Sequence, residues 1–117
     1  MNLTAIIGHF GKKATEIVER HQFHRMFQQN DESIDSFVSK LRGQAAKCNF
    51  VYTVNYSTGE SDAQVVNSAT KDISDEMIIY RIVVSIYDEP TRTKLLREPN
   101  LTLESAIDLI RTVEVAD

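Results

Sequence analysis

The side chains in this sequence that could most readily bind a metal or act as a nucleophile are its histidines and its single cysteine. His21 and His24 are three residues apart, which places both imidazoles on one face of a helix and suits a metal ion. A zinc site needs more ligands, and His9 and Cys48 stand at no recognised ligand spacing from this pair. Cys48 lies on an apolar stripe and has no partner in a nucleophile motif. We therefore expect two partly exposed histidines, a buried inert thiol and no metal.

Nothing else in the sequence is typical of an active site. The acidic pairs Asp75-Glu76 and Asp88-Glu89 fall where predicted helices begin, and negative charge is favourable there without any catalytic role. The sequence has no glycine-rich loop that would cradle a phosphate. We expect no enzyme activity and no cofactor.

The composition and charge of the chain argue against further classes of function. A chain of 117 residues is one domain by size, and 13 basic against 17 acidic residues give a net charge of −4. This balance argues against a broad nucleic-acid-binding face, because such faces neutralise phosphates. Arg92, Lys94 and Arg97 lie beside Glu89 and Glu98, a pattern typical of a solvated mixed-charge face.

The sequence also bears on location. One cysteine cannot form an internal disulfide. No charged start leads into an apolar segment, and no apolar run approaches the roughly 18 residues that a membrane span needs. We expect a cytoplasmic protein without a membrane partner.

The elements that must position these side chains are predicted to be helices. The sequence contains only four Gly and two Pro, and apolar residues recur at helical spacing in most segments. Helices are expected over 2–10, over about 14–28, from Asn30 or Asp31 to about Cys48, over about 74–86, from Asp88 towards Pro99, and after Thr102. The predicted fold class is all-α, a compact bundle of about five helices, with no sheet beyond a short ribbon near Val51–Tyr56.

The cleanest apolar stripe belongs to the helix that follows Asn30. The acids Asp31, Glu32 and Asp35 stand where a helix N-terminus favours negative charge. Its stripe fits a period of about 3.6 residues and consists of Ile34, Phe37, Val38, Leu41, Ala45 and Cys48. We predict a core that contains Ile34, Phe37, Leu41, Ile82, Ile86, Ile107 and Ile110.

A polar segment over about 51–71 interrupts the helical pattern. It contains Gly59 and many Ser, Thr and Asn residues, and only its start favours an extended conformation. The remainder is predicted to be a long exposed loop. Loops of this length are either functional or disordered, and both alternatives stay open.

Three stretches together resemble a known family. They are ERHQFHRMFQQNDESIDSFVSKLRGQAAKCNF, ISDEMIIYRIVVSIYDEPTRTKLLREP and NLTLESAIDLIRTVE. Their order and spacing are similar to the C-terminal lobe of the capsid region in the Gag polyprotein of gypsy-type long-terminal-repeat retrotransposons, and to Arc-like domesticated Gag proteins. The resemblance covers nearly the whole chain apart from the segment over 51–71, which is longer than in relatives.

The resemblance gives a role to the polar residues before the third helix. Retroviral capsid C-terminal domains carry a major homology region, which Gln28, Glu32, Phe37 and Leu41 resemble. In that family the polar members form a buried hydrogen-bond network that fixes the turn before the helix. A buried Gln and Glu are costly unless they satisfy each other. The match departs at Gln29, which replaces the usual Gly, and a simply capped helix is the alternative.

The function implied by the resemblance is assembly. Capsid lobes of this type pair and pack into virus-like particles that enclose the element's RNA. No CxxC occurs in the sequence, so RNA would be bound only indirectly, through a segment of the Gag polyprotein that follows. We expect an isolated lobe, or a fragment of a longer polyprotein, that self-associates weakly as a homodimer.

Two alternatives stay open for partner and function. The predicted self-association surface consists of apolar residues in excess of the core, namely Ile17, Val18, Phe23, Met77 and Ile78. If these residues fill the core instead, the lobe is monomeric alone and pairs only at high local concentration. The alternative function is a SCAN-like or adaptor dimerisation domain of a regulatory protein.

Overall fold

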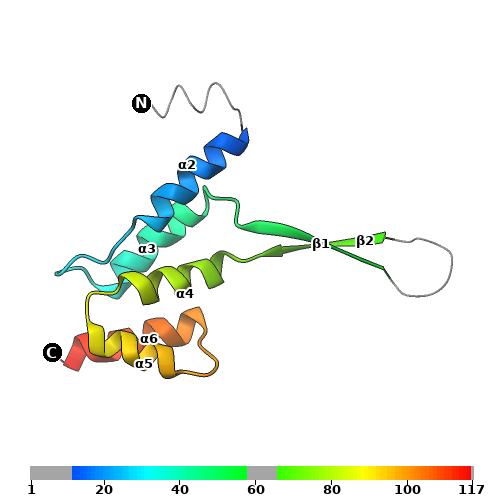
Figure 1. Ribbon diagram of the computed structural model, residues 1–117. Helices are drawn as coiled ribbons and strands as arrows, with labels where there is room; N and C mark the ends of the chain where they lie inside the picture. The colour runs from blue at the N-terminus through cyan, green and yellow to red at the C-terminus, as the bar shows by residue number, and fades with distance from the viewer. Residues whose placement is uncertain (1–11, 58–65, 117) are drawn as a thin grey trace.

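The computed structural model describes residues 12–57 and 66–116. Its elements, in chain order, are α2 (Lys12–His24), α3 (Ile34–Ala45), β1 (Val51–Ser57), β2 (Val66–Asp72), α4 (Ser74–Ser85), α5 (Glu89–Arg97) and α6 (Leu103–Ala116). The helix expected over 2–10 lies outside the described residues. The five described helices pack together, and the two strands form a hairpin that projects away from them (Figure 1).

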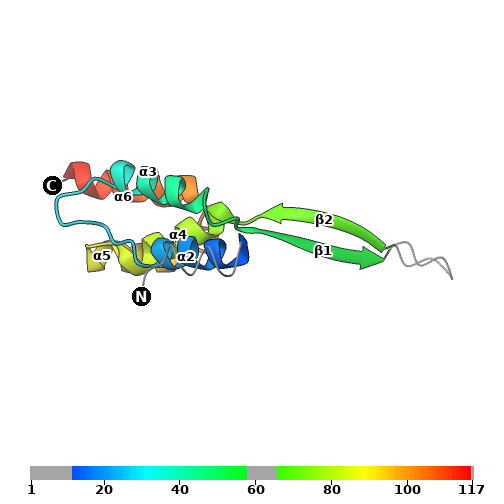
Figure 2. The ribbon, with the colours of Figure 1, turned by 90° about the horizontal axis from the view of Figure 1, so that it is seen from above.

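The helices form two layers around one core. Seen from above, α3 and α6 lie in one layer, and α2, α4 and α5 lie in the other (Figure 2). The core has the composition that helical periodicity predicts: all seven residues expected to be buried are at most 9% exposed. Cys48 is also fully buried at the end of the α3 stripe, as expected for an inert thiol, and burial raises the pKa of that thiol.

Two helix ends near the major-homology-like segment differ from expectation. The second helix ends at His24 rather than near Gln28, so residues 25–33 form a connecting loop. The N-cap of α3 is Ser33, whose hydroxyl accepts a hydrogen bond from the Ser36 amide at 3.1 Å. The prediction of Asn30 or Asp31 as the cap was therefore wrong: these two residues form a turn before the helix, and the extended residue that precedes the first helical turn is Ser33.

The caps of α5 and α6 match local sequence signals, whereas the N-cap of α4 is Ile73, whose side chain makes no capping hydrogen bond. Asp88 caps α5 by accepting a hydrogen bond from the Thr91 amide, with Pro90 in the first turn. Thr102 and Ser105 exchange hydrogen bonds at the start of α6, in a capping-box arrangement. Asp72 accepts a hydrogen bond from the Ser74 amide where α4 begins.

The segment over 51–71 is the main correction to the predicted fold. Only its start was expected to be extended, yet β1 pairs antiparallel with β2 along its whole length, from Val51 opposite Asp72 to Ser57 opposite Val66. The second strand was missed because its residues, VNSATKD, are mostly polar and favour a strand only once β1 supplies the pairing. The fold is therefore mostly helical with one two-stranded sheet, and not all-α.

A pair of matched leucine substitutions tests the assignment of the core. Leu41→Ala removes a fully buried side chain and should lower the free energy of unfolding by about 2–5 kcal/mol, through lost burial and a residual cavity. Leu96→Ala, at a side chain that is 67% exposed, should change it by at most about 0.5 kcal/mol. Urea unfolding of dilute protein followed by circular dichroism measures both values, and equal losses would contradict the core described here.

Candidate functional site

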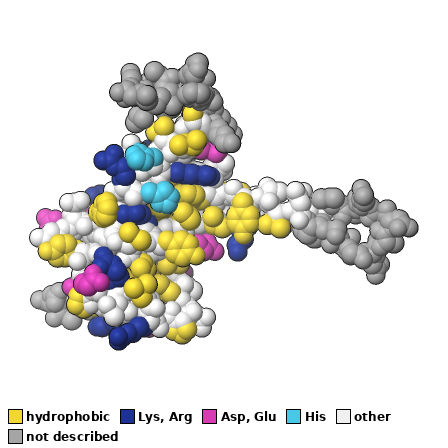
Figure 3. Space-filling model, in the orientation of Figure 1, with side chains coloured by type: hydrophobic (Ala, Val, Ile, Leu, Met, Phe, Trp, Pro, Cys, Tyr) yellow, Lys and Arg dark blue, Asp and Glu magenta, His cyan; other side chains and the backbone are white. Residues whose placement is uncertain are grey.

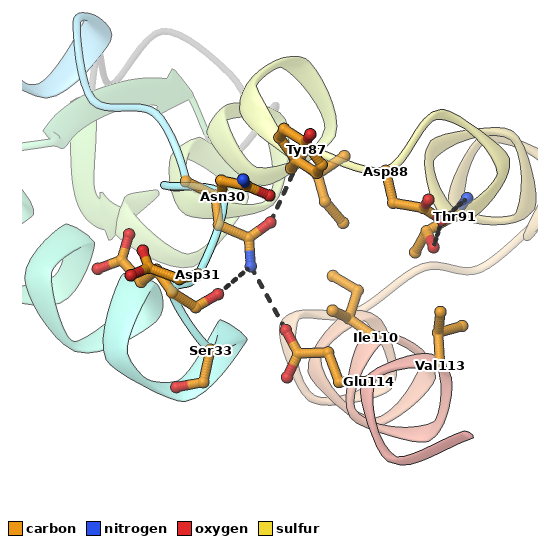
Figure 4. A pocket seen from close by; sticks show the side chains of 12 residues that line it. Asn30, Asp31, Ser33, Tyr87, Asp88, Thr91, Ile110, Val113 and Glu114 are labelled. Carbon is orange, nitrogen blue, oxygen red and sulfur yellow. Dashed lines mark hydrogen bonds between the residues drawn. The ribbon is translucent and has the colours of Figure 1, made fainter. Parts of the chain in front are cut away.

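One glutamine side chain joins three parts of the chain. Gln28 Nε2 donates to the Glu32 carbonyl at 3.0 Å and to Glu114 Oε1 at 3.4 Å. Its Oε1 accepts from the Tyr87 amide at 3.2 Å, and its own backbone N–H donates to the Ser85 carbonyl. The amide therefore links the loop before α3 to the end of α6 and to the α4–α5 junction, as the dashed lines in Figure 4 show.

Glu32 closes the turn between Gln28 and α3. Its carboxylate accepts hydrogen bonds from the Gln29 amide at 3.1 Å and the Ser36 hydroxyl at 3.2 Å, and pairs with Lys40 Nζ at 2.6 Å. The side chain is only 7% exposed. Burial by itself would raise the pKa of Glu32, but the hydrogen bonds from Lys40, Gln29 and Ser36 outweigh it and lower that pKa.

The third member of the network was not predicted. Glu114 Oε1 accepts a hydrogen bond from the Ile34 amide at 2.9 Å, so it satisfies one of the free N–H groups at the start of α3 from 80 positions away. Figure 4 shows the Glu114 side chain pointing from α6 toward this loop. Sequence did hold one signal, because an acid in the last turn of a helix opposes the helix dipole and needs a compensating contact.

The predicted major-homology-like residues divide between the polar junction and the core. Gln28 and Glu32 make the polar turn, while Phe37 and Leu41 are at most 1% exposed in the core along the helix that follows. The resemblance implies a buried network, whereas the observed one is half-buried. A cavity of about 440 Å³ opens beside it. This cavity is lined by Gln28, Asn30, Asp31, Glu32, Ser33, Ile86, Tyr87, Asp88, Thr91, Ile110, Val113 and Glu114 (Figure 4).

Three of the four acids that line this cavity are engaged in structural contacts. Asp88 caps α5, Glu114 holds the start of α3, and Glu32 is paired with Lys40. Within the described residues, no group of three or more His, Cys, Asp or Glu side chains lies where it could hold a metal ion. His21 and His24 are both exposed on α2. The contacts of Asp88, Glu114 and Glu32 position the helices.

Two arginines tie α4 to its neighbours: Arg92 joins it to α5, and Arg81 joins it to the loop after α2. Arg92, expected on a solvated face, is partly buried and donates to the carbonyls of Val83, Val84 and Ile86 at the end of α4. It therefore caps the C-terminus of α4, where cations are favourable. Arg81 is buried, donates from Nε to the Met26 carbonyl at 2.8 Å, and has its guanidinium 4.7 Å from the Phe27 ring centre.

The α4–α5 pair presents an exposed apolar surface. Tyr80, Val84 and Leu96 are 63%, 59% and 67% exposed, and we call these three residues the α4–α5 face. They border a groove of about 370 Å³. The groove is lined by Glu76, Ile79, Tyr80, Val83, Val84, Leu95, Leu96, Glu98 and Leu101. Hydrophobic side chains gather over α4 and α5 on the molecular face that Figure 3 shows.

The structure revises the predicted self-association surface. Phe23 and Ile78 are 0% and 1% exposed, so including these two was wrong and both belong to the core. Val18 and Met77 are partly buried, and Ile17 is exposed. Helical periodicity indicates that α2 and α4 each have an apolar face, but both helices carry more apolar residues than the face that packs on the core can hold. Only the packing decides which of these residues stay exposed. On α4 they are Tyr80 and Val84.

Comparison of the chain with protein-family models, with curated proteins and with solved structures finds no match in any of the three. No helix in the described part of the chain combines the length and the hydropathy that a membrane span requires.

The lowered pKa of Glu32 predicts an acid dependence of stability. Because the folded-state pKa lies below the ordinary value of 4.5, the stabilisation is complete above that value and is lost as pH falls through the folded-state pKa. Glu32→Gln should lower the free energy of unfolding at pH 7 by about 1–3 kcal/mol, since it removes a charge-assisted network. The same variant should show a shallower loss of stability between pH 5 and pH 3 than the wild type, by about one titrating carboxylate.

The control for this measurement is Glu98→Gln, a substitution at an exposed glutamate outside the network. It should retain the wild-type stability at pH 7 and the wild-type acid dependence. An acid dependence of Glu32→Gln that superimposes on the wild-type curve would show that the Glu32 contacts do not contribute to stability.

Proposed function

We propose that this chain is a structural assembly module, equivalent to the C-terminal capsid lobe of a gypsy-type Gag protein or a domesticated Gag protein, and that it works by self-association. The observation that carries the proposal is the α4–α5 face, three large apolar side chains around a groove on a helical domain. Monomeric proteins usually scatter their exposed apolar residues singly, and a contiguous patch indicates a contact surface. The resemblance of the three sequence stretches to Gag capsid lobes supplies the kind of contact, which is with further copies.

The polar network supports this proposal by making the contact surface rigid. Gln28 holds the α4–α5 junction through the Tyr87 amide, and Arg92 holds the end of α4 against α5. A surface whose two helices keep a constant angle loses little conformational entropy when it binds. The same network resembles the major homology region in composition and in its position before α3.

The proposed contact is small and symmetric. Identical subunits most often pair about a two-fold axis, so the α4–α5 face of one copy would lie against the same face of another. A patch of three exposed apolar residues is far below the area of an obligate interface, which favours micromolar or weaker affinity. Weak contacts suit a shell, because misplaced subunits can dissociate and reassemble. The remaining partners in this proposal are other segments of a Gag polyprotein in a cytoplasmic particle, with RNA bound by those segments.

Two valines that differ in location test the proposed surface. Val84→Asp places a charge in the α4–α5 face and should weaken self-association at least tenfold, because a buried unpaired carboxylate is costly. Val115→Asp introduces the same charge at an 84% exposed position near the end of α6 and should leave association unchanged. Sedimentation velocity from about 10 μM to 1 mM measures both, over the affinity range expected for weak contacts.

Two outcomes would contradict the proposal. A wild-type chain that stays monomeric at 1 mM would reject self-pairing of this domain. Equal association of Val84→Asp and the wild type would show that the contact lies elsewhere. Circular dichroism of each variant verifies that the helical fold is retained, which is expected because both positions are exposed.

A further inference from the structure

The β1–β2 hairpin is a second surface without a partner in the described part of the chain. It projects away from the helices, and its sheet contains only these two strands (Figures 1 and 2). Described side chains of β1 are exposed, including Tyr52 at 43% and Val54 at 44%. An isolated two-stranded hairpin is at best marginally stable in water, and a third strand or a packed face is needed for independent stability.

The two faces of the hairpin differ in chemistry. Side chains alternate along a strand, so Tyr52 and Val54 share one face with their cross-strand partners Lys71 and Ala69. Beyond Val51 at its base, the opposite face of β1 carries Thr53 and Asn55. The Tyr52–Val54 face of β1 is therefore the more apolar of the two, and Lys71 is the charged residue beside it.

Among the described residues, the outer edge of β1 carries none of three common protections against pairing. Exposed edge strands are usually interrupted by charge, proline or a bulge. The β1 sequence VYTVNYS contains no charged residue, no Pro and no Gly, and its pairing with β2 is continuous over seven residues. The other strand carries Lys71 and Asp72, so the β2 edge is partly protected. A further strand should therefore be added at the edge of β1 and not at the edge of β2, and the added strand should itself be uncharged.

The base of the hairpin is held firmly by α2. Arg20 donates to the carbonyls of Cys48 and Asn49 at 2.9 and 2.8 Å, and Asn49 Nδ2 donates to Glu16 Oε1 at 2.8 Å. Asn49 has a φ of 53°, a left-handed conformation that asparagine tolerates better than most residues. Phe50 packs edge-on against Phe23 at 5.1 Å. The hairpin is therefore presented at a defined angle from the helices.

We propose that β1 pairs antiparallel with β1 of a second copy of this chain, about a two-fold axis at Val54, to form a four-stranded intermolecular sheet. In an antiparallel pairing centred on Val54, a residue before Val54 in one copy lies opposite the residue that is equally far after Val54 in the other copy. These two sequence positions differ by an even number, so both side chains lie on the same face of the sheet. The more apolar faces of the two hairpins therefore become continuous. The absence of charge in β1 means that this self-pairing opposes no like charges.

This contact stands independently of the α4–α5 face. If both operate, each copy has two different two-fold contacts, and such a subunit propagates into an extended array and does not stop at a dimer. The hairpin would then supply the lateral connection between pairs. A strand from another protein is the competing occupant, and the experiment below separates it from a second copy.

A charge exchange at Val54 tests the proposed register. In Val54→Lys the two introduced lysines face each other on the axis, and in Val54→Glu the two glutamates do. Each variant alone should therefore pair at least tenfold more weakly than the protein that keeps Val54 in the same background. An equimolar mixture of the two variants should regain the association of that parent protein, because Lys then pairs with Glu. Sedimentation velocity is performed in a Val84→Asp background, so that only contacts outside the α4–α5 face are measured.

Hydrogen exchange provides the second measurement and the control. Amides of β1 should exchange more slowly as the protein concentration rises, whereas those of β2 should not change. Ser68→Lys places the same charge on β2, away from the proposed contact, and should retain wild-type association. β1 exchange that is independent of concentration up to 1 mM, or a mixture of the Val54 variants that fails to associate, would overturn the proposal. Neither result depends on whether the α4–α5 face is used.

Discussion

The arrangement of the helices depends on the satisfaction of one half-buried side-chain amide, that of Gln28. Gln28 offers a donor and an acceptor where three segments meet, and Glu32, Glu114 and the Tyr87 amide complete its hydrogen bonds. Each partner comes from a different part of the chain, so the network can form only when α3, α6 and the α4–α5 junction are together. A half-satisfied group there would cost about 1–3 kcal/mol, which makes the arrangement cooperative.

The α4–α5 face and the β1–β2 hairpin also depend on the satisfaction of backbone polar groups. Arg92 satisfies the last carbonyls of α4, and Arg20 satisfies those of the turn that leads into β1. Both arginines replace water at the ends of elements, where backbone groups would otherwise lack partners. The α4–α5 face and the hairpin are therefore held in a constant orientation relative to one core.

Much of the fold and part of the candidate site could be predicted from sequence. The α3 stripe and the acidic start of α5 are local patterns, and each is found where it was expected. The Gln28–Glu32 turn was expected from the family resemblance, and it is half-buried where a buried network was expected. Two residues of the predicted contact surface, Phe23 and Ile78, are core residues instead. Residues of the α4–α5 face carry no local mark that separates them from core residues of the same helix.

Sequence by itself determined which segments are helical and which residues form the α3 side of the core, because helical periodicity is a property of neighbours three and four positions apart. Tertiary structure alone decided that Glu114 would cap α3, that the polar segment 66–72 would become a strand, and that Tyr80 and Val84 would stay outside. These outcomes depend on partners distant in the chain. Their free energies arise only when packing brings the partners together, so no local pattern can contain them.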